Sequence, residues 1–474
     1  MAHIYDANAQ KNVPDMTKVQ TTISPIDGQP VASIELPTST DQLDAMLDKG
    51  HEAFKQWRRR PLAERLEIVS RSVDKLVERR SDLADELTIM MARPRRYTES
   101  EISTYEDRAK WLIANAQQSL KDENVDSGRP AGFNRVIRRT PLGVCLLVGA
   151  WNFPYMIQVN ALIPALLAGN SVILKPSPQT PRVAERILES LLAAGLPKDV
   201  MHLTPPQMDY VVGHPLVSFV SFTGSVANGQ RVEKTAAAFP GPGFKHVGLE
   251  LGGKDAAYVR EAENIVDGAM FNSGQSCCAV ERVYVHEKVY DAFVQECVKV
   301  VKGYVLDDPR KPDTTLGPVI SLRSAATIRS HIAEAVGKGA KALIDESLFP
   351  LAKQDTTYVA PQVLIDVDHS MKVMSEETFG PVMGIMKVKN DSEALRLIND
   401  SPYGLTASVW TKSQDAFDEL VDEIETGTVF MNRCDYLDPA LPWTGVKDSG
   451  RGISLSRLGF DAVTRAKSVH ARLP

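Results

Sequence analysis

The sequence of 474 residues lacks the motifs by which several large classes of protein are recognised. It has no CxxC pair and no HExxH motif, and its nine histidines are scattered, so we expect no metal site. No run of about 18 apolar residues occurs, which excludes a membrane-spanning helix. The first segment, MAHIYDANAQKNVPD, has neither a basic nor an apolar stretch, so we expect no signal peptide.

The sequence also has few cysteines and only a small net charge. The formal net charge of −6 gives no reason to expect binding to nucleic acid or to a membrane. Two basic clusters, WRRRP and RPRRY, are surrounded by acidic residues, and we interpret them as solvated helix faces. The cysteines are odd in number and too scattered for a disulfide framework: Cys145, Cys277, Cys278, Cys297 and Cys434. A reducing compartment, most simply the cytoplasm, is therefore expected.

What the sequence does contain is the pattern of a large globular chain. Its hydrophobic content is 43%, its charged content is 24%, and its length indicates two or three domains. Residues 21–34 alternate around a Pro-Ile-Asp-Gly turn and predict a β-hairpin. Helices are predicted over 39–57, 61–91 and 99–120, the first of them with a capping box of Ser39 and Gln42.

Short apolar runs then alternate with helical segments. GVCLLVGAW, SVILKPS and VSFVSFTGS end in small or polar residues, and similar runs return in RVYVHEK, VMGIMKVKN, LTASVWT and TVFMN. This alternation is typical of parallel sheets buried on both faces, so we expect two successive α/β blocks that meet near Glu250. Ligands of such sheets bind beyond the carboxyl ends of the strands. The turn FTGS, which leads to Gly229, is also compatible with phosphate binding at a helix N-terminus.

The stretch FNSGQSCCAVER, residues 271–282, places two adjacent cysteines behind a Gly-Gln pair. Taken alone, Cys277 could be a packing residue, a metal ligand, a redox partner or a nucleophile. A disulfide between Cys277 and Cys278 would close a small strained ring, which disfavours a redox pair. In isolation the packing interpretation is favoured for Cys277, and it is kept for Cys278, Cys145 and Cys297.

A series of motifs along the chain favours the nucleophile interpretation of Cys277 over the packing interpretation. In chain order they are GAWNFPY (149–155), ILKPSPQTP (173–181), FTGS (222–225), LELGGK (249–254), GQSC (274–277), EETFGPV (376–382), SPYGL (401–405) and PWTGVKDSG (442–450). The series resembles the NAD(P)-dependent aldehyde dehydrogenase superfamily over essentially the whole chain. Within it, the chain is most similar to the bacterial-type branch that acts on semialdehydes and aromatic aldehydes.

The resemblance implies an α/β fold with three parts. A Rossmann-type lobe, residues 1–122 and 142–251, would bind the dinucleotide, and a second α/β lobe, residues 252–455, would carry the catalytic cysteine. Residues 123–141 and 456–474 would form a small strand element for oligomerisation. A homodimer or homotetramer is therefore expected, because an exposed strand edge is normally covered by a partner.

The resemblance also implies roles for single residues in oxidising an aldehyde to the acid. Cys277 would form a thiohemiacetal and then a thioester, Asn152 would bind the oxyanion with the backbone N–H of Cys277, and Glu250 would activate water. The implied cofactor residues are Trp151, Lys175, Ser177, Gly224, Ser225, Gly229, Leu251, Glu377 and Phe379. The implied substrate contacts are Asn160, Leu437 and Trp443. Lys254, beside the base, is expected to be structural.

Several departures from the family pattern bear on function. Pro178 stands where many NAD-preferring members carry a glutamate, so the cofactor is expected to be NAD or NADP, with NAD slightly favoured. The glycines usual before FTGS are absent. The link from Glu250 to Cys277 is about seven residues short, which is close to two helical turns; lower stability or activity than in close relatives is therefore expected. Asn160 is polar where some relatives have an aromatic, which would suit an aldehyde bearing a carboxylate or carbonyl.

Two other functions stay open at this point. A relative that passes the acyl group to coenzyme A is disfavoured by Glu250, because that branch generally lacks the base. A non-catalytic protein that has kept the fold is disfavoured by the combination of Cys277, Asn152 and Glu250, which folding alone does not demand.

Overall fold

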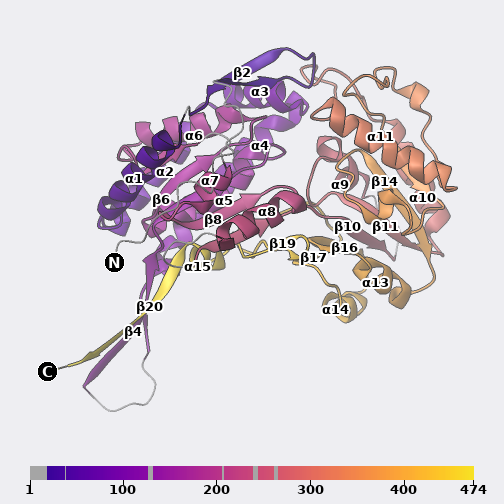
Figure 1. The fold of residues 1–474 in the computed structure, drawn as a ribbon. Helices are drawn as coiled ribbons and strands as arrows, with labels where there is room; N and C mark the ends of the chain where they lie inside the picture. Colours follow the sequence, from indigo (N-terminus) through magenta and orange to yellow (C-terminus); the bar gives the residue numbers. More distant parts are fainter. Residues whose placement is uncertain are drawn as a thin grey trace.

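The computed structural model describes residues 19–37, 39–125, 132–204, 208–238, 244–260 and 265–473. Two lobes lie side by side, and a strand element projects away from both of them, with the C-terminus at its tip (Figure 1). Each lobe is built on one large sheet, of six strands in the first and seven in the second. The predicted α/β class is thus confirmed.

The first lobe begins with the predicted hairpin, β1 (Val19–Ile23) and β2 (Pro30–Glu35), which are antiparallel. Four helices follow: α1 (Thr40–Trp57), α2 (Leu62–Val77), α3 (Arg80–Met91) and α4 (Arg95–Leu120). The single helix predicted over 61–91 is wrong, because Arg79 has φ −101° and ψ 16°, outside the helical region. Ser39 precedes α1, but its side chain accepts no hydrogen bond from the helix, so the part of the predicted capping box that Ser39 would make is not formed.

The first sheet has the order β19-β9-β8-β5-β6-β7 and is parallel except for β19. Its strands are β5 (Val144–Val148), β6 (Ser171–Lys175), β7 (Met201–Leu203), β8 (Val217–Thr223), β9 (His246–Glu250) and β19 (Gly450–Arg451). The intervening helices are α5 (Pro154–Ala168), α6 (Pro181–Ala193), α7 (Met208–Gly213) and α8 (Val226–Ala238). All five residues of β5 are buried, as its continuous apolar run predicts.

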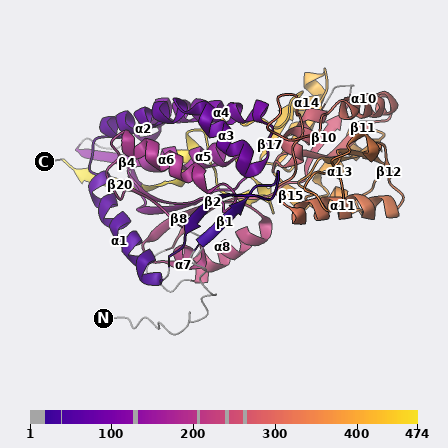
Figure 2. The same ribbon diagram turned by 90° about the horizontal axis from the view of Figure 1, so that it is seen from above.

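The second sheet has the order β12-β13-β14-β11-β10-β16-β17, and β12 is its antiparallel strand. Its strands are β10 (Asp255–Val259), β11 (Val280–His286), β12 (Lys341–Ala342), β13 (Gln362–Ile365), β14 (Val382–Val388), β16 (Thr406–Trp410) and β17 (Thr428–Met431). Its longer helices are α10 (Tyr290–Lys302), α11 (Leu322–Gly337), α13 (Asp391–Asn399) and α14 (Gln414–Val421). The shorter elements are α9 (Val266–Met270), η1 (Phe271–Gly274), η2 (Glu346–Leu348), α12 (Lys372–Ser375), β15 (Tyr403–Gly404), β18 (Val446–Lys447) and α15 (Leu458–Ala462). Seen from above, α11 and α10 lie on the second lobe, away from α1 and α2 (Figure 2).

The projecting element consists of β3 (Glu123–Asn124), β4 (Phe133–Pro141) and β20 (Thr464–Arg472). β4 and β20 pair along their whole length, from Thr464 opposite Pro141 to Arg472 opposite Phe133. The strands expected in residues 123–141 and in the C-terminal tail are therefore present, with residues 126–131 outside the described part.

The passage from the first sheet to the second positions the site. β9 ends at Glu250, and β10 opens the second sheet at Asp255. β19, from the range expected to form the second lobe, instead pairs with β9 at the edge of the first sheet. The predicted helix before Cys277 is only α9, five residues long; residues 261–264 lie outside the described part. Among the described residues, no helix is long and apolar enough to cross a membrane.

Candidate active site

A cavity of about 550 Å³ joins residues from both lobes, and we call it the front cavity. α4, α5, the end of β9 and the loops around 277 and 435 contribute to its wall. The lining residues used below are Arg108, Asn160, Thr223, Glu250, Leu251, Asp267, Cys277, Cys278, Asp435, Leu437 and Trp443. Two predicted catalytic residues, Cys277 and Glu250, and the three predicted substrate contacts therefore share one wall.

The loop that carries Cys277 is fixed by an unusual backbone. Asn272 and Ser273 both have left-handed φ angles, 54° and 56°, and Gly274 has φ 69°. A Cβ atom on Gly274 would lie 2.0 Å from the carbonyl oxygen of Gly380, so only glycine fits. The Asn272 side chain donates to the carbonyl of Gln275 at 3.1 Å, which closes the loop on itself. Cys277 itself is half-buried and faces the cavity.

Asp435 binds the residues on either side of Cys277, and the sequence analysis did not find it. Its Oδ1 accepts hydrogen bonds from the Cys278 thiol at 2.9 Å and from the Ser276 hydroxyl at 3.1 Å. Burial raises the pKa of Asp435 to about 6. Cys278 is buried, as its packing role predicts, but its thiol also fixes this carboxylate. No motif in the sequence surrounds Asp435, so only the fold could reveal it.

Glu250 stands at the end of β9 with its two carboxylate oxygens bound differently. Oε1 accepts a hydrogen bond from the hydroxyl of Ser454, and Oε2 accepts one from Thr223 at 3.4 Å. Burial raises the pKa of Glu250, whereas the bond from Ser454 and the charge of Arg108 oppose this rise. Burial thus makes the Glu250 carboxylate a better proton acceptor than an exposed glutamate.

Arg108 on α4 is a buried guanidinium in the wall of the front cavity, and the sequence analysis missed it. Its Nη1 donates to the carbonyl of Met156 at 3.0 Å and to the Oδ1 of Asn160 at 3.2 Å, while its Nε has no hydrogen-bond partner in the described part of the chain. Among the described residues, no carboxylate forms an ion pair with it within 4.0 Å. Burial lowers the pKa of Arg108, and the nearby charge of Glu250 is the largest opposing influence.

Asn152 and Trp151 follow β5; among the described residues their neighbour Phe153 lines the front cavity, whereas these two do not. Asn152 is buried, and its backbone carbonyl accepts hydrogen bonds from the side chains of Arg93 and Asn272. Its side-chain amide makes no hydrogen bond within the described part of the chain, so its N–H groups can serve a ligand. Trp151 packs edge-on against Phe379, with ring centroids 5.6 Å apart.

The loop at Phe379 is held by a buried ion pair. Phe379 has a left-handed φ of 54°, and its N–H donates to Glu281 at 3.0 Å. Glu281 also pairs with Lys254, which is fully buried, so Lys254 has the structural role expected of it. The Oε1 of Glu377 accepts a hydrogen bond from the N–H of Gly253 at 3.0 Å, and burial raises the pKa of Glu377 to about 8.

The remaining predicted cofactor residues follow neighbouring strands of the first sheet. Lys175 ends β6; among the described residues, its Nζ donates a hydrogen bond only to the adjacent Pro176 carbonyl, at 3.3 Å. Ser177 is buried, and its hydroxyl oxygen accepts a hydrogen bond from the N–H of Gln179 at 3.3 Å. Gly224 donates its N–H to the carbonyl of Glu250 at 3.1 Å, and Ser225 directly precedes α8. On Gly229, a Cβ atom would lie 2.5 Å from the Leu251 side chain. These residues fit a dinucleotide, because a lysine with free donors and small residues gather at the strand ends.

Comparison with known proteins gives a consistent result. The family model described as "Aldehyde dehydrogenase family" matches residues 13–469. A succinate-semialdehyde dehydrogenase [NADP(+)] of Deinococcus radiodurans is 30% identical over 95% of this chain and 94% of its own. A betaine aldehyde dehydrogenase of Sinorhizobium fredii is 31% identical over 91% of this chain and 89% of its own.

Among solved structures, the fold is similar to that of an NADP-dependent glyceraldehyde-3-phosphate dehydrogenase from Bacillus halodurans, complexed with NADP. The TM-score is 0.89 at 30% identity, and the match covers 96% of each chain.

Proposed function

The chain belongs to the aldehyde dehydrogenase family and oxidises an aldehyde to the carboxylic acid with NAD(P)⁺, and we propose that Cys277, Glu250 and Asn152 carry out this reaction. The support is their placement: Cys277 and Glu250 line one cavity, and Asn152 is anchored to the loop of Cys277. The three expected substrate contacts, Asn160, Leu437 and Trp443, and the expected cofactor contact Leu251 line the same cavity as Cys277 and Glu250.

In the proposed reaction, Cys277, Asn152 and Glu250 each have a defined step. The Cys277 thiolate attacks the aldehyde carbon, and the amide of Asn152 with the N–H of Cys277 stabilises the oxyanion. NAD(P)⁺, when bound, supplies the hydride acceptor that turns this adduct into a thioester. Glu250 then takes a proton from the water that attacks the thioester, and Cys277 leaves as the thiolate. The presence of this base supports transfer of the acyl group to water over transfer to coenzyme A.

We further propose that the substrate is an aldehyde that carries a carboxylate, and one observation carries this proposal. Arg108 is a buried cation in the wall of the cavity that holds Cys277, and it has no carboxylate partner within the described residues. A buried charge is costly unless it is paired, and arginine binds carboxylates in a bidentate manner. Asn160, which accepts a hydrogen bond from Arg108, would orient this anchor.

Two of the relatives are named for aldehydes of opposite charge, and Arg108 favours one of these charges over the other. One is named for succinate semialdehyde, an anion at neutral pH, and another for betaine aldehyde, a cation. A buried guanidinium repels a cation and attracts an anion. Besides Glu250, two acids among the described residues line this cavity, and both have partners, because Asp435 binds Cys278 and Ser276, and Asp267 accepts a hydrogen bond from Tyr304.

The test compares succinate semialdehyde with pentanal, an uncharged aldehyde of similar length, in the wild type and in Arg108→Met. We expect the variant to raise KM for succinate semialdehyde by at least about tenfold, the effect of one charged hydrogen bond, and to leave KM for pentanal within twofold. Arg108→Lys should restore part of the binding. An equal loss for both aldehydes would show that Arg108 supports the site rather than the substrate.

We propose that both NAD and NADP are used. Support comes from Pro178, which puts no negative charge beside the adenosine ribose; its carbonyl accepts a hydrogen bond from Thr22 at 2.7 Å, so the loop can keep its path when the side chain changes. Pro178→Glu should lower kcat/KM for NADP while sparing NAD, and Pro178→Gln is the neutral control. Equal effects of the two substitutions on NADP would contradict this role.

We infer that the expected division into domains holds apart from β19, which belongs to the first sheet. Residues 1–122 and 142–251 bind the dinucleotide, the rest of 252–455 is catalytic, and the strands of 123–141 and 456–474 join subunits. β4 and β20 project from the body, and β17 is a half-buried edge strand; both support a homodimer or homotetramer. Sedimentation of the wild type and of a chain truncated before β20 would test this assembly. The five free cysteines support function in the cytoplasm.

A further inference from the structure

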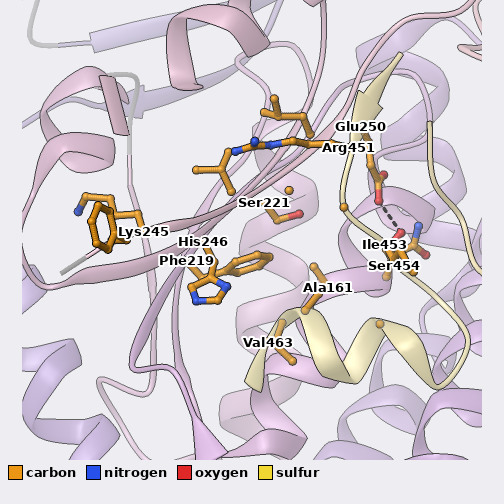
Figure 3. A pocket seen from close by; sticks show the side chains of 18 residues that line it. Ala161, Phe219, Ser221, Lys245, His246, Glu250, Arg451, Ile453, Ser454 and Val463 are labelled. Carbon is orange, nitrogen blue, oxygen red and sulfur yellow. Dashed lines mark hydrogen bonds between the residues drawn. The ribbon is translucent and has the colours of Figure 1, made fainter. Parts of the chain in front are cut away.

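The carboxylate of Glu250 lies between two cavities and belongs to the wall of both. The second of them, which we call the rear cavity, measures about 430 Å³ and is lined by β8, β9, α5, α15 and residues 451–454. Figure 3 shows Glu250 and Ser454 on one side of it, with Phe219 opposite. Oε1 of Glu250 accepts a hydrogen bond from Ser454 in the rear wall, and Oε2 accepts one from Thr223 in the front wall. A hydroxyl group from each side therefore holds the base in place.

The segment that follows Glu250 contacts the loop 376–379, which carries two of the predicted cofactor residues. The N–H of Gly253 donates to Oε1 of Glu377 at 3.0 Å. A Cβ atom on Gly252 would lie 2.2 Å from Oε2 of Glu377, so this carboxylate packs directly on the backbone behind the base. The position of the loop therefore decides where Glu377 stands relative to Glu250.

The same loop also packs against α11, through an apolar and a polar side chain. A Cβ atom on Gly380 would lie 2.4 Å from the Cδ1 atom of Ile328. The Nδ1 atom of His331 lies 3.2 Å from the Oγ1 atom of Thr378. Ile328 and His331 are three residues apart, so they share one face of the helix, and both are buried. Thr378 stands between the two predicted cofactor residues of the loop, Glu377 and Phe379.

The groups around Thr378 assign the direction of each hydrogen bond. Lys254 can only donate, and its Nζ donates to Oγ1 of Thr378 at 3.1 Å. The hydroxyl proton of Thr378 is then directed at Nδ1 of His331, so the ring accepts there and carries its proton on Nε2, which lies 3.7 Å from Oε2 of Glu376. Burial lowers the pKa of His331, and Lys254 lowers it further, against the charges of Glu376 and Glu281. A neutral ring is what this acceptor role requires.

Glu281 and His331 hold different parts of the loop. Glu281 accepts hydrogen bonds from the backbone N–H groups of Thr378, at 2.9 Å, and of Phe379, at 3.0 Å. His331 binds the side chain of Thr378. Without the acceptor on His331, the buried hydroxyl proton of Thr378 would either lack a partner or turn away and disturb the bond from Lys254.

We propose that His331 is a positioning residue for the nicotinamide half of the cofactor. Through the hydroxyl of Thr378 it keeps the loop 376–379 in the place where Glu377 meets the nicotinamide ribose and Phe379 packs beside the ring. The proposal rests on the function proposed above, because the roles of Glu377 and Phe379 belong to it. His331 acts through the loop and takes no part in the chemical steps.

Four substitutions separate the hydrogen bond from the packing of the ring. His331→Leu removes the acceptor and keeps a buried apolar side chain of similar size. His331→Asn restores an acceptor, because the amide oxygen can stand where Nδ1 does. Thr378→Val removes the hydroxyl group from the other partner and keeps its shape. His369→Asn is the matched control, since His369 belongs to the same lobe but contacts Tyr284 and Asp400 instead.

The experiment measures the binding of NAD, NADP and ADP by calorimetry, without an aldehyde. ADP has the adenosine half of the cofactor but no nicotinamide ribose. We expect His331→Leu and Thr378→Val each to raise Kd for NAD and NADP by about three- to tenfold, the effect of one buried hydrogen bond, and to leave Kd for ADP within about twofold. The double variant should lose no more than either single one, because both remove the same interaction. His331→Asn and His369→Asn should bind like the wild type.

Each other result overturns the proposal in a recognisable way. Unchanged Kd for NAD in His331→Leu would show that the loop does not need this contact, and equal losses for NAD and ADP would show that His331 supports the whole fold. Additive losses in the double variant would show that His331 does not act through Thr378. An equal loss in His331→Asn and His331→Leu would assign the effect to packing.

The function proposed above has a separate test in the same series. If Glu377→Ala leaves Kd for NAD unchanged while Kd for ADP is also unchanged, Glu377 does not hold the nicotinamide ribose. If the wild type forms no reduced nicotinamide from any aldehyde, or if Cys277→Ala retains turnover, the catalytic roles are wrong. Either result contradicts the proposed function itself and is distinct from a failure at His331.

Discussion

Two buried arginines near the active site, Arg93 and Arg108, have opposite surroundings. Arg93 is 2% exposed and every nitrogen is engaged: it pairs with Glu101, donates to Asn272 and to the carbonyl of Asn152, and lies 4.4 Å from the ring of Phe153. Arg108 is 4% exposed and makes two hydrogen bonds within the described part of the chain, both donated by Nη1. The contrast teaches that burial alone does not show the role of a charged side chain. Its hydrogen-bond and ion-pair partners show that role. Arg93 holds the fold together, and Arg108 is available to a ligand.

The largest effect is expected from replacing Arg93, the arginine whose nitrogens all have hydrogen-bond partners. Arg93→Met leaves Glu101 buried without its partner, which costs about 3–5 kcal/mol, and releases Asn152 and Asn272 from their anchor. We expect a large loss of unfolding free energy in urea titrations and loss of activity with every aldehyde, charged or not. A stable variant with normal activity toward pentanal would remove the distinction between the two arginines.

Replacing Arg108, which has no carboxylate partner among the described residues, is expected to have a smaller effect on stability. Arg108→Met removes a buried cation that has no carboxylate partner in the described structure and loses two hydrogen bonds to neutral groups, so the two contributions offset each other to within about 1–2 kcal/mol. The same urea titration gives the comparison with Arg93→Met. A loss as large as that of Arg93→Met would show that Arg108 is structural.

Arg108 also bears on the pH dependence of turnover. Its charge lowers the pKa of Glu250, against the rise that burial causes, so Arg108→Met should raise the pKa of Glu250 further. Because Glu250 acts as the carboxylate, turnover increases as pH rises through this pKa. The acid limb of the kcat profile should therefore move to higher pH in the variant, measured with pentanal. The hydrogen bonds from Ser454 and Thr223 are unchanged in this comparison. An unmoved limb would show that Arg108 does not influence the base.

The smallest effect is expected at Asp435. Its pKa of about 6 means that it is mainly ionised at neutral pH, where its charge opposes a substrate carboxylate on the same wall. Asp435→Asn keeps an acceptor for Cys278 and Ser276 but removes the charge. KM for succinate semialdehyde should fall slightly above pH 6 and stay the same below it, while KM for pentanal stays constant. A rise in both would mean that the loop of Cys277 needs the charge.

Part of the site could be predicted from the sequence because its residues stand inside local motifs. Cys277 follows a glycine whose left-handed φ and contact with Gly380 exclude any side chain, and Glu250 ends an apolar strand run. The parallel strands were predictable for the same reason: a strand buried on both faces must be apolar at every position. The helix over 61–91 was predicted wrongly, because its periodicity continues across a local break at Arg79.

Other residues could not be found in this way, because nothing in their local sequence distinguishes them. Arg108 lies in a polar helix that reads as an ordinary amphipathic one, and Asp435 lies in a loop without a motif. Ser454 reaches Glu250 only because β19 returns from the far end of the chain to pair with β9.

The sequence by itself thus determined the fold class and the family, and it predicted the nucleophile and the base, since these depend on short stretches whose residue types and order are sufficient. The tertiary structure alone decided which buried charge is paired and which is open, and which side of Glu250 faces which cavity. Ion pairing and the lining of a cavity depend on side chains from segments that are distant in the sequence. The spacing of these residues along the chain does not predict that they are close in space.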